Sequence, residues 1–223
     1  TISFTPQNNE SQWKLQFKLS SDTSWTNVST FDLSNTPTFT MIGLLSSTAY
    51  DFRVKAICSA NDNSEWSNFS FLTAISSLPW LESFDSYGTG TYVFPTIDNG
   101  WAKIVNLRSG DIYISSDGNS LPGALRFQTS YDSSNYVLSP KIDNSISLNT
   151  LRVKFKLKIK NTNHNLIVGV MSDPTDTNTF VQVDELSLNE ANTWKDIEIL
   201  LNSYNGNGQY IAFKSKNIGN CSI

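Results

Sequence analysis

A single histidine, His164, limits the catalytic chemistry available to this chain of 223 residues. A serine-histidine-aspartate mechanism would have to use it. It lies in the segment Lys-Asn-Thr-Asn-His-Asn (160–165), whose residue types are typical of a turn between strands, and no Gly-x-Ser-x-Gly motif accompanies it. A zinc site has little more support, because the two cysteines, Cys58 and Cys221, lie far apart without metal-type spacing. We therefore expect no catalytic residue, and two free thiols.

Paired carboxylates are the other route to catalysis, since glycosidases project two of them from one sheet face. Asp184 and Glu185 are adjacent in a predicted strand, so their side chains point to opposite faces. Asp196 and Glu198 share a face, but they alternate with isoleucines as the solvent side of a strand does. A glycan-processing enzyme is accordingly the least favoured function.

Composition and charge argue against two further classes of protein. The net charge is −4, and four lysines that alternate along one predicted strand (Lys154, Lys156, Lys158 and Lys160) indicate a solvated face, so we expect no nucleic-acid partner. No apolar run reaches about 18 residues, so we expect no transmembrane segment. Only 16% of residues are charged, and Ser, Thr and Asn take their place, as in secreted β proteins.

The hydrophobic pattern predicts an all-β chain, because short alternating segments recur between clusters of Gly, Asn, Asp, Ser and Pro. In the clearest strand, residues 50–58, one face carries Tyr50, Phe52, Val54, Ala56 and Cys58. Other strands are expected within 2–6, 13–19, 24–29, 38–44, 68–74, 80–86, 100–105, 111–116, 124–129, 135–140, 148–159, 165–173, 180–188, 193–201 and 209–216.

Residues 1–74 resemble a fibronectin type III domain. The resemblance rests on three stretches: WKLQFKLSSDTSWTNVS, FTMIGLLSSTAYDFRVKAICS and SEWSNFSFLT. Tyr50 follows Leu44 by six residues at the start of a strand, as in a tyrosine corner, where the hydroxyl ties down the preceding loop. The family's first strand is missing, and Phe4 stands where the second usually carries a tryptophan.

Residues 79–223 resemble the MAM-like and cleaved-adhesin jelly-roll domains of Bacteroidetes surface proteins. The matching stretches are LPWLESFDS, YVLSPKID, LIVGVMSDPTDTNTFVQVDELSL and TWKDIEILLNSYNGNGQYIAFKS. This implies a concanavalin-like jelly roll of two sheets, apparently without the family's last strand. Residues 74–79 are expected to form a short polar connection between the two domains.

The same resemblance implies a structural calcium ion, because similar domains use an acidic residue of the first strand as a ligand. Asp85 is the candidate, with Glu82 as the lesser one. The alternative is an exposed carboxylate at a strand end.

Aromatic residues are the candidates for ligand recognition, since their faces stack on sugar rings. Trp101 and Trp194 match core positions of the jelly roll, so we interpret them as packing residues. The tryptophans of the first domain are interpreted in the same way: Trp13, Trp25 and Trp66. Four tyrosines in Gly-, Ser- or Asn-rich loops are the candidates for an exposed binding rim: Tyr87, Tyr92, Tyr131 and Tyr204.

The preferred function is a non-catalytic adhesion or binding module of a larger secreted or cell-surface protein, with glycans or another surface protein as partner. The alternative is a structural spacer with no ligand of its own. The two hypotheses differ in whether clustered aromatic and amide side chains are exposed or buried.

Overall fold

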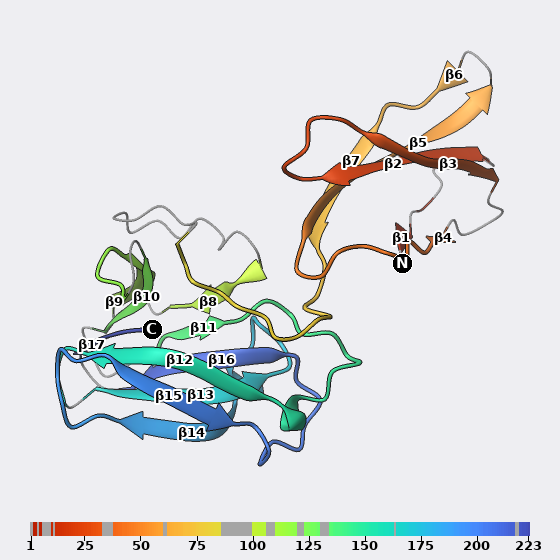
Figure 1. Ribbon diagram of the computed structural model, residues 1–223. Helices are drawn as coiled ribbons and strands as arrows, with labels where there is room; N and C mark the ends of the chain where they lie inside the picture. The colour runs from red at the N-terminus through yellow and green to blue at the C-terminus, as the bar shows by residue number, and fades with distance from the viewer. Residues whose placement is uncertain are drawn as a thin grey trace. The chain divides into compact units, whose positions relative to one another are not determined.

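The computed structural model describes residues 2–3, 5, 10, 12–32, 38–59, 62–85, 100–105, 110–119, 123–129, 134–162, 164–216 and 219–223. The chain divides into two compact units, Thr1–Ala74 and Ile75–Ile223 (Figure 1). Almost all regular elements are antiparallel strands, apart from short 3-10 helices such as η2 (Leu148–Thr150) and η3 (Thr177–Thr179). Within these residues no helix has the length and apolar character needed to cross a membrane.

The first unit has a larger sheet of order β3-β2-β5-β6, in which β7 also pairs with β5, and a two-stranded sheet, β1-β4. Its strands are β1 (Ile2–Ser3), β2 (Gln12–Leu19), β3 (Thr26–Asp32), β4 (Thr38–Phe39), β5 (Ala49–Ser59), β6 (Asp62–Asn63) and β7 (Ser67–Leu72). Its core lies on the inner face of β2 and β5, where partly buried side chains of β1 and β4, Ile2 and Phe39, pack against it. The all-β, sandwich-like arrangement predicted from the sequence is confirmed.

Alternation along β5 follows the sequence pattern for four of its five apolar positions. Tyr50, Phe52, Val54 and Ala56 are buried. Cys58 is exposed, which contradicts the expected inward position. The register with β6 shifts immediately beside it, so the strand has already left the packed region.

The tyrosine corner is confirmed. The Tyr50 hydroxyl oxygen accepts a hydrogen bond from the Leu45 backbone N–H at 3.0 Å, and Tyr50 is only 4% exposed. The hydroxyl therefore anchors the loop that enters β5.

Tyr50→Phe is expected to lower the free energy of unfolding of the first unit by about 1–2 kcal/mol, because the Leu45 N–H loses its acceptor while the ring still packs. Urea denaturation followed by tryptophan fluorescence measures the change. Tyr136→Phe is the matched control, because no hydrogen bond of its hydroxyl is found among the described residues. Equal effects of the two substitutions would contradict the anchoring role.

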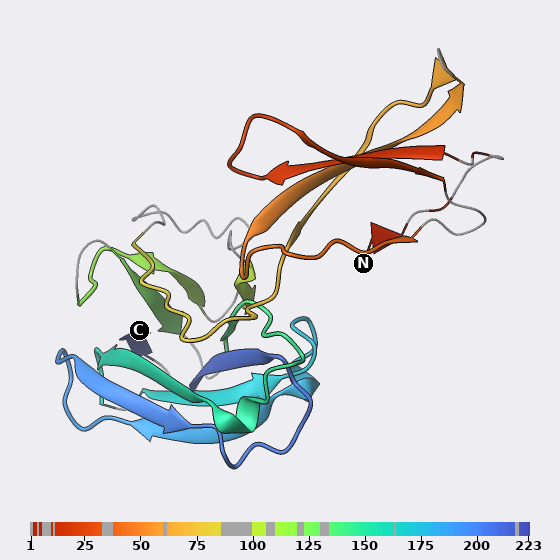
Figure 2. The same ribbon diagram turned by 45° about the vertical axis from the view of Figure 1, so that its right-hand side comes forward.

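The second unit is a sandwich of two five-stranded sheets, β15-β12-β17-β10-β9 and β14-β13-β16-β11-β8 (Figure 2). Its strands are β8 (Ala102–Ile104), β9 (Gly110–Ser115), β10 (Ala124–Thr129), β11 (Tyr136–Leu138), β12 (Arg152–Ile159), β13 (Asn165–Met171), β14 (Val181–Ser187), β15 (Lys195–Leu200), β16 (Tyr210–Lys216) and β17 (Gly219–Ser222). Both sheets send buried side chains into one core, with Phe127 and Leu157 from the first sheet and Leu166 and Phe213 from the second.

Two segments near the start of the second unit differ from expectation. Ile75 belongs to this unit rather than to a polar connection. It is 1% exposed, its N–H donates to the Lys141 carbonyl at 2.8 Å, and its carbonyl accepts from the Asp143 N–H at 2.9 Å. The strand expected at 80–86 is absent from its described part, 80–85, where Phe84 has a positive φ of 59° that no strand adopts.

Candidate functional site

The tyrosines predicted to form an exposed rim do not form one in the described residues. Tyr87, Tyr92 and Tyr131 lie outside the part of the chain that the structure describes. Tyr204 is 6% exposed, so its expected exposed position is wrong. The following loop curls over its ring, and the Gly208 N–H donates to the Tyr204 hydroxyl at 2.7 Å. A Cβ on Gly206 would lie 2.3 Å from that oxygen, so only glycine allows so close an approach.

The two residues proposed for calcium lie at different kinds of position. Both carboxylate oxygens of Glu82 accept hydrogen bonds, one from the Phe84 N–H at 2.8 Å and one from Trp101 Nε1 at 3.2 Å. These bonds account for its position without an ion. Asp85 is exposed, and no group of three His, Cys, Asp or Glu residues is found in the described part of the chain, whereas Ca²⁺ takes six to eight oxygen ligands. A calcium ion at Asp85 stays a prediction.

His164 is placed where it cannot exchange protons with a bound substrate. It is fully buried, and neither ring nitrogen has a hydrogen-bond partner among the described residues. Burial lowers its pKa to about 4, so the imidazole is neutral at physiological pH. Within the described residues its ring nitrogens contact neither an orienting acid nor a nucleophile.

The carboxylates on the outer face of β15 form ion pairs with the lysine face of β12. Glu198 pairs with Arg152 and Lys154 at 3.1 Å each, and Asp196 pairs with Lys156 at 2.7 Å. Hydrogen bonds from Lys154 and Arg152 hold the pKa of Glu198 below its usual value, so it is a poor proton donor. Lys154, Lys156 and Lys160 are exposed as the sequence predicts, but the side chain of Lys158 is only 11% exposed, which differs from the expected solvated position.

An aromatic patch on the outer face of the other sheet was not predicted. We define it as Tyr136, Phe180, Tyr210 and Lys214. Val137 and Phe213 point into the core, so their neighbours Tyr136 and Lys214, which are opposite each other in the β11–β16 register, point outward. Tyr136 is only 8% exposed and belongs, with Leu138, Met171 and Ala212, to a second apolar cluster against which Phe180 and Tyr210 pack.

The rings of the patch pack at fixed angles. Tyr136 and Phe180 meet edge to face, with ring centroids 5.4 Å apart and planes inclined at 72°. The Lys214 ammonium lies 5.3 Å from the Tyr136 centroid and 5.5 Å from that of Phe180, within cation–π range of both. Phe180 and Tyr210 are half-buried, so each keeps part of its surface in solvent.

The turn between β13 and β14 positions Phe180. Asp176 caps η3 by accepting from the Asn178 N–H, and Asp173 accepts from the Thr175 N–H at 2.8 Å. The ring then lies over Gly169 of β13, where a Cβ would come within 2.7 Å of it. Asp173 and Asp176 therefore stabilise this turn through their own side chains.

Tyr210 lies close enough to Asp173 for their charges to interact. Burial, and then the Asp173 carboxylate, raise the pKa of the Tyr210 hydroxyl above its usual value. The hydroxyl therefore stays protonated and can act as a hydrogen-bond donor. The surface combines apolar ring faces, a cation and hydroxyl and carboxylate groups at its edge.

Two tryptophans assigned to packing behave differently. Trp101 is 7% exposed, which confirms its core position. Trp194 is half-buried rather than in the core, and the Lys158 ammonium lies 4.8 Å from its ring centroid. Strand β15 begins only at Lys195, so Trp194 precedes the paired region.

No protein-family model matches the chain, and no curated protein matches it. Among solved structures, the K2 cleaved adhesin domain of Lys-gingipain matches with a TM-score of 0.46 and 15% identity over 63% of this chain and 93% of that one. The K1 domain of Lys-gingipain from Porphyromonas gingivalis W83 matches with a TM-score of 0.43 and 17% identity, over 63% and 91%. TmCBM61 in complex with β-1,4-galactotriose matches with a TM-score of 0.37 and 17% identity, over 60% and 93%. These likenesses are distant, and the architecture given above rests on the chain's own strand pairing.

Proposed function

We propose that this chain is a non-catalytic carbohydrate-binding module of an extracellular or cell-surface protein, with the aromatic patch of the second unit as its binding surface. The first unit is a fibronectin type III-like domain in this proposal, and the second is a jelly roll of the cleaved-adhesin kind. The observation that carries the proposal is the patch itself: half-buried Phe180 beside Lys214, with half-buried Tyr210 packed against the same apolar cluster.

The chemistry of the patch suits a sugar. The apolar face of a pyranose ring packs on aromatic rings, while its hydroxyls need donors and acceptors at the edge. Phe180 and Tyr210 supply ring surface, Lys214 supplies a donor, and Asp173 at the Tyr210 side supplies an acceptor. The strand scaffold fixes these groups before binding, which reduces the entropy lost on association.

The first experiment is a glycan array probed with the whole chain, once with calcium and once with chelator. Binding to a class of neutral glycans supports the proposal. Binding that disappears on chelation would in addition support calcium near Asp85, tested by Asp85→Asn with Glu82→Gln as the comparison. No glycan binding in either buffer would favour a structural spacer.

Phe180→Ala and Tyr210→Ala are each expected to weaken binding of the best array glycan by about ten-fold or more, because each removes ring surface worth about 1–3 kcal/mol of contact. Isothermal titration calorimetry measures the change. Trp194→Ala is the matched control, since it removes another half-buried ring on a different surface. Equal loss in all three variants, or loss only with Trp194→Ala, would refute the assignment of the patch.

A further inference from the structure

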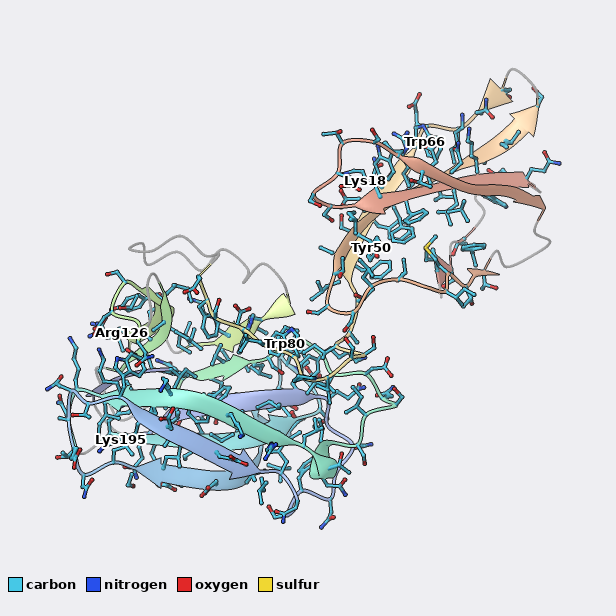
Figure 3. The ribbon with its side chains drawn as sticks, in the orientation of Figure 1. Lys18, Tyr50, Trp66, Trp80, Arg126 and Lys195 are labelled. Carbon is cyan, nitrogen blue, oxygen red and sulfur yellow. The ribbon has the colours of Figure 1, made fainter. Side chains whose placement is uncertain are left out.

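A second charged surface lies on the outer face of the first unit, on strands β2 and β5. The antiparallel register places Lys14 opposite Lys55, Gln16 opposite Arg53, and Lys18 opposite Asp51. These positions alternate with the buried residues Leu15 and Phe52, so they project to the other side of the sheet. Figure 3 labels Lys18 and Trp66 of this face and Tyr50 of the inner face.

One end of this row is electrically neutralised within the protein. Lys18 Nζ lies 2.8 Å from the Asp51 carboxylate, which also accepts hydrogen bonds from the Ser20 and Ser70 hydroxyls. The hydrogen bond from Lys18, followed by those from the two serines, lowers the pKa of Asp51 to about 2. This end therefore needs no external partner.

The other end carries three cationic side chains, Lys14, Arg53 and Lys55. Among the described residues, no ion pair is formed by Lys14, Arg53 or Lys55. Lys14 and Lys55 are direct cross-strand neighbours, and like charges in that position destabilise a sheet. Arg53 lies on the same face two residues from Lys55, so three cations share one side of two adjacent strands. An anion bound here would remove the repulsion.

Arg53 is held in a fixed geometry between two indoles. Its guanidinium carbon lies 4.2 Å from the Trp25 ring centroid and 4.4 Å from that of Trp66. Its Nε donates to Gln16 Oε1 at 2.7 Å, and Gln16 Nε2 donates in turn to Asn27 Oδ1 at 2.6 Å. The two Nη groups have no acceptor within the described part of the chain. Stacking and the Nε bond thus orient a planar fork whose remaining donors match a carboxylate or sulfate.

We propose that Lys14, Arg53 and Lys55, with Trp25 and Trp66, form a binding site for an anionic polysaccharide, whose carboxylate or sulfate groups contact the Arg53 fork and the two lysines. Indole rings beside cations suit a charged sugar, because the ring packs while the acid pairs. A nucleic-acid backbone is the weaker occupant, since it requires many phosphate contacts, and the whole chain has a net charge of −4. This site is independent of the aromatic patch on the second unit.

The test titrates the whole chain with three oligosaccharides of equal length: oligogalacturonate for carboxylate, heparin-derived oligosaccharide for sulfate, and neutral β-1,4-galactan. Calorimetry at two salt concentrations gives Kd and its salt dependence. We expect binding of at least one acidic probe that weakens as salt rises, whereas any binding of the neutral galactan is assigned to the aromatic patch and should not depend on salt. Tighter binding of oligogalacturonate would identify carboxylate as the preferred acid group of the ligand, and tighter binding of the heparin-derived oligosaccharide would identify sulfate.

Two variants assign the binding to this face. Lys14→Gln/Lys55→Gln is expected to weaken binding of the acidic probe by about ten-fold or more. Loss of the Lys55 contact with the Trp66 ring, 5.2 Å to the centroid, is offset by removal of the repulsive pair, so the melting temperature should change little. Lys154→Gln/Lys156→Gln changes the net charge equally on the second unit and should leave binding intact. Arg53→Lys keeps the positive charge but removes the planar guanidinium with its two Nη donors, so it should also weaken binding of the acidic probe.

Three results would overturn the inference: no binding of either acidic probe, equal loss in the two lysine double variants, or tighter binding of a short DNA duplex. None of them bears on the aromatic patch, whose variants and neutral glycans are tested separately.

Discussion

Tyr204→Ala is expected to lower the free energy of unfolding of the second unit by about 4 kcal/mol, the usual cost of removing a buried aromatic ring. Tyr204 is 6% exposed and belongs to the main core, and its hydroxyl accepts the Gly208 N–H. The substitution therefore leaves a cavity and an unpaired N–H. Urea denaturation followed by circular dichroism measures the loss.

Tyr204→Phe separates the ring from the hydroxyl. It keeps the packing but removes the acceptor of the buried Gly208 N–H, so we expect about 1–2 kcal/mol of destabilisation. Stability unchanged within error in both variants would mean that Tyr204 is an exposed loop residue after all, as its Asn- and Gly-rich surroundings had suggested.

Acidification is expected to destabilise the second unit through His164 by about 3 kcal/mol between pH 7 and pH 4. The pKa of this imidazole falls from its usual 6.5 to about 4 because of burial. Between these values the unfolded chain binds a proton that the folded chain does not, so stability falls as the pH falls. Above pH 6.5 both states are neutral, and the contribution to stability is fully present.

His164→Phe isolates this effect, because His164 is the chain's single histidine and phenylalanine does not titrate. The informative quantity is the difference in unfolding free energy between wild type and variant at each pH, in which the carboxylates cancel. This difference should shift in favour of the variant by about 3 kcal/mol on going from pH 7 to pH 4. If the unfolding free energies of wild type and variant change in parallel with pH, His164 accepts a proton in the folded protein as readily as in the unfolded chain. That result would contradict the lowered pKa.

The parts of the fold that the sequence predicts well are strands with one buried and one solvated face. In β5 apolar and charged residues alternate from Tyr50 to Ala56, and Tyr50 adds a tyrosine corner. In β12 the alternating lysines indicate a solvated side, and Lys154 and Lys156 are exposed there. Period-two patterns are reliable because a slip by one residue would bury every charge.

The parts that escaped prediction depend on contacts distant in sequence. Strand β17 (Gly219–Ser222) has almost no apolar pattern of its own, yet it pairs with both β10 and β12, and Cys221 is 1% exposed. Burial holds the pKa of that thiol far above its usual value, so it is inert. Tyr204 was misassigned because the glycines that suggested an exposed loop instead allow the chain to fold over the ring.

The aromatic patch does leave a signal in the sequence. The segments Tyr136–Leu138 and 210–213 are apolar at consecutive positions rather than alternating. Such runs indicate strands covered on both faces. What the sequence does not specify is that Phe180, from the β13–β14 turn, lies against Tyr136 and Lys214.

The most direct test of carbohydrate binding at the patch is a nuclear magnetic resonance titration of the whole chain with the best neutral glycan from the array. Backbone amide and aromatic ring resonances report on each surface separately. The proposal predicts saturable shifts centred on Phe180, Tyr210 and Lys214, with Trp194 and the lysine face of β12 unaffected. Saturable shifts centred elsewhere, with those three residues unmoved, would contradict it.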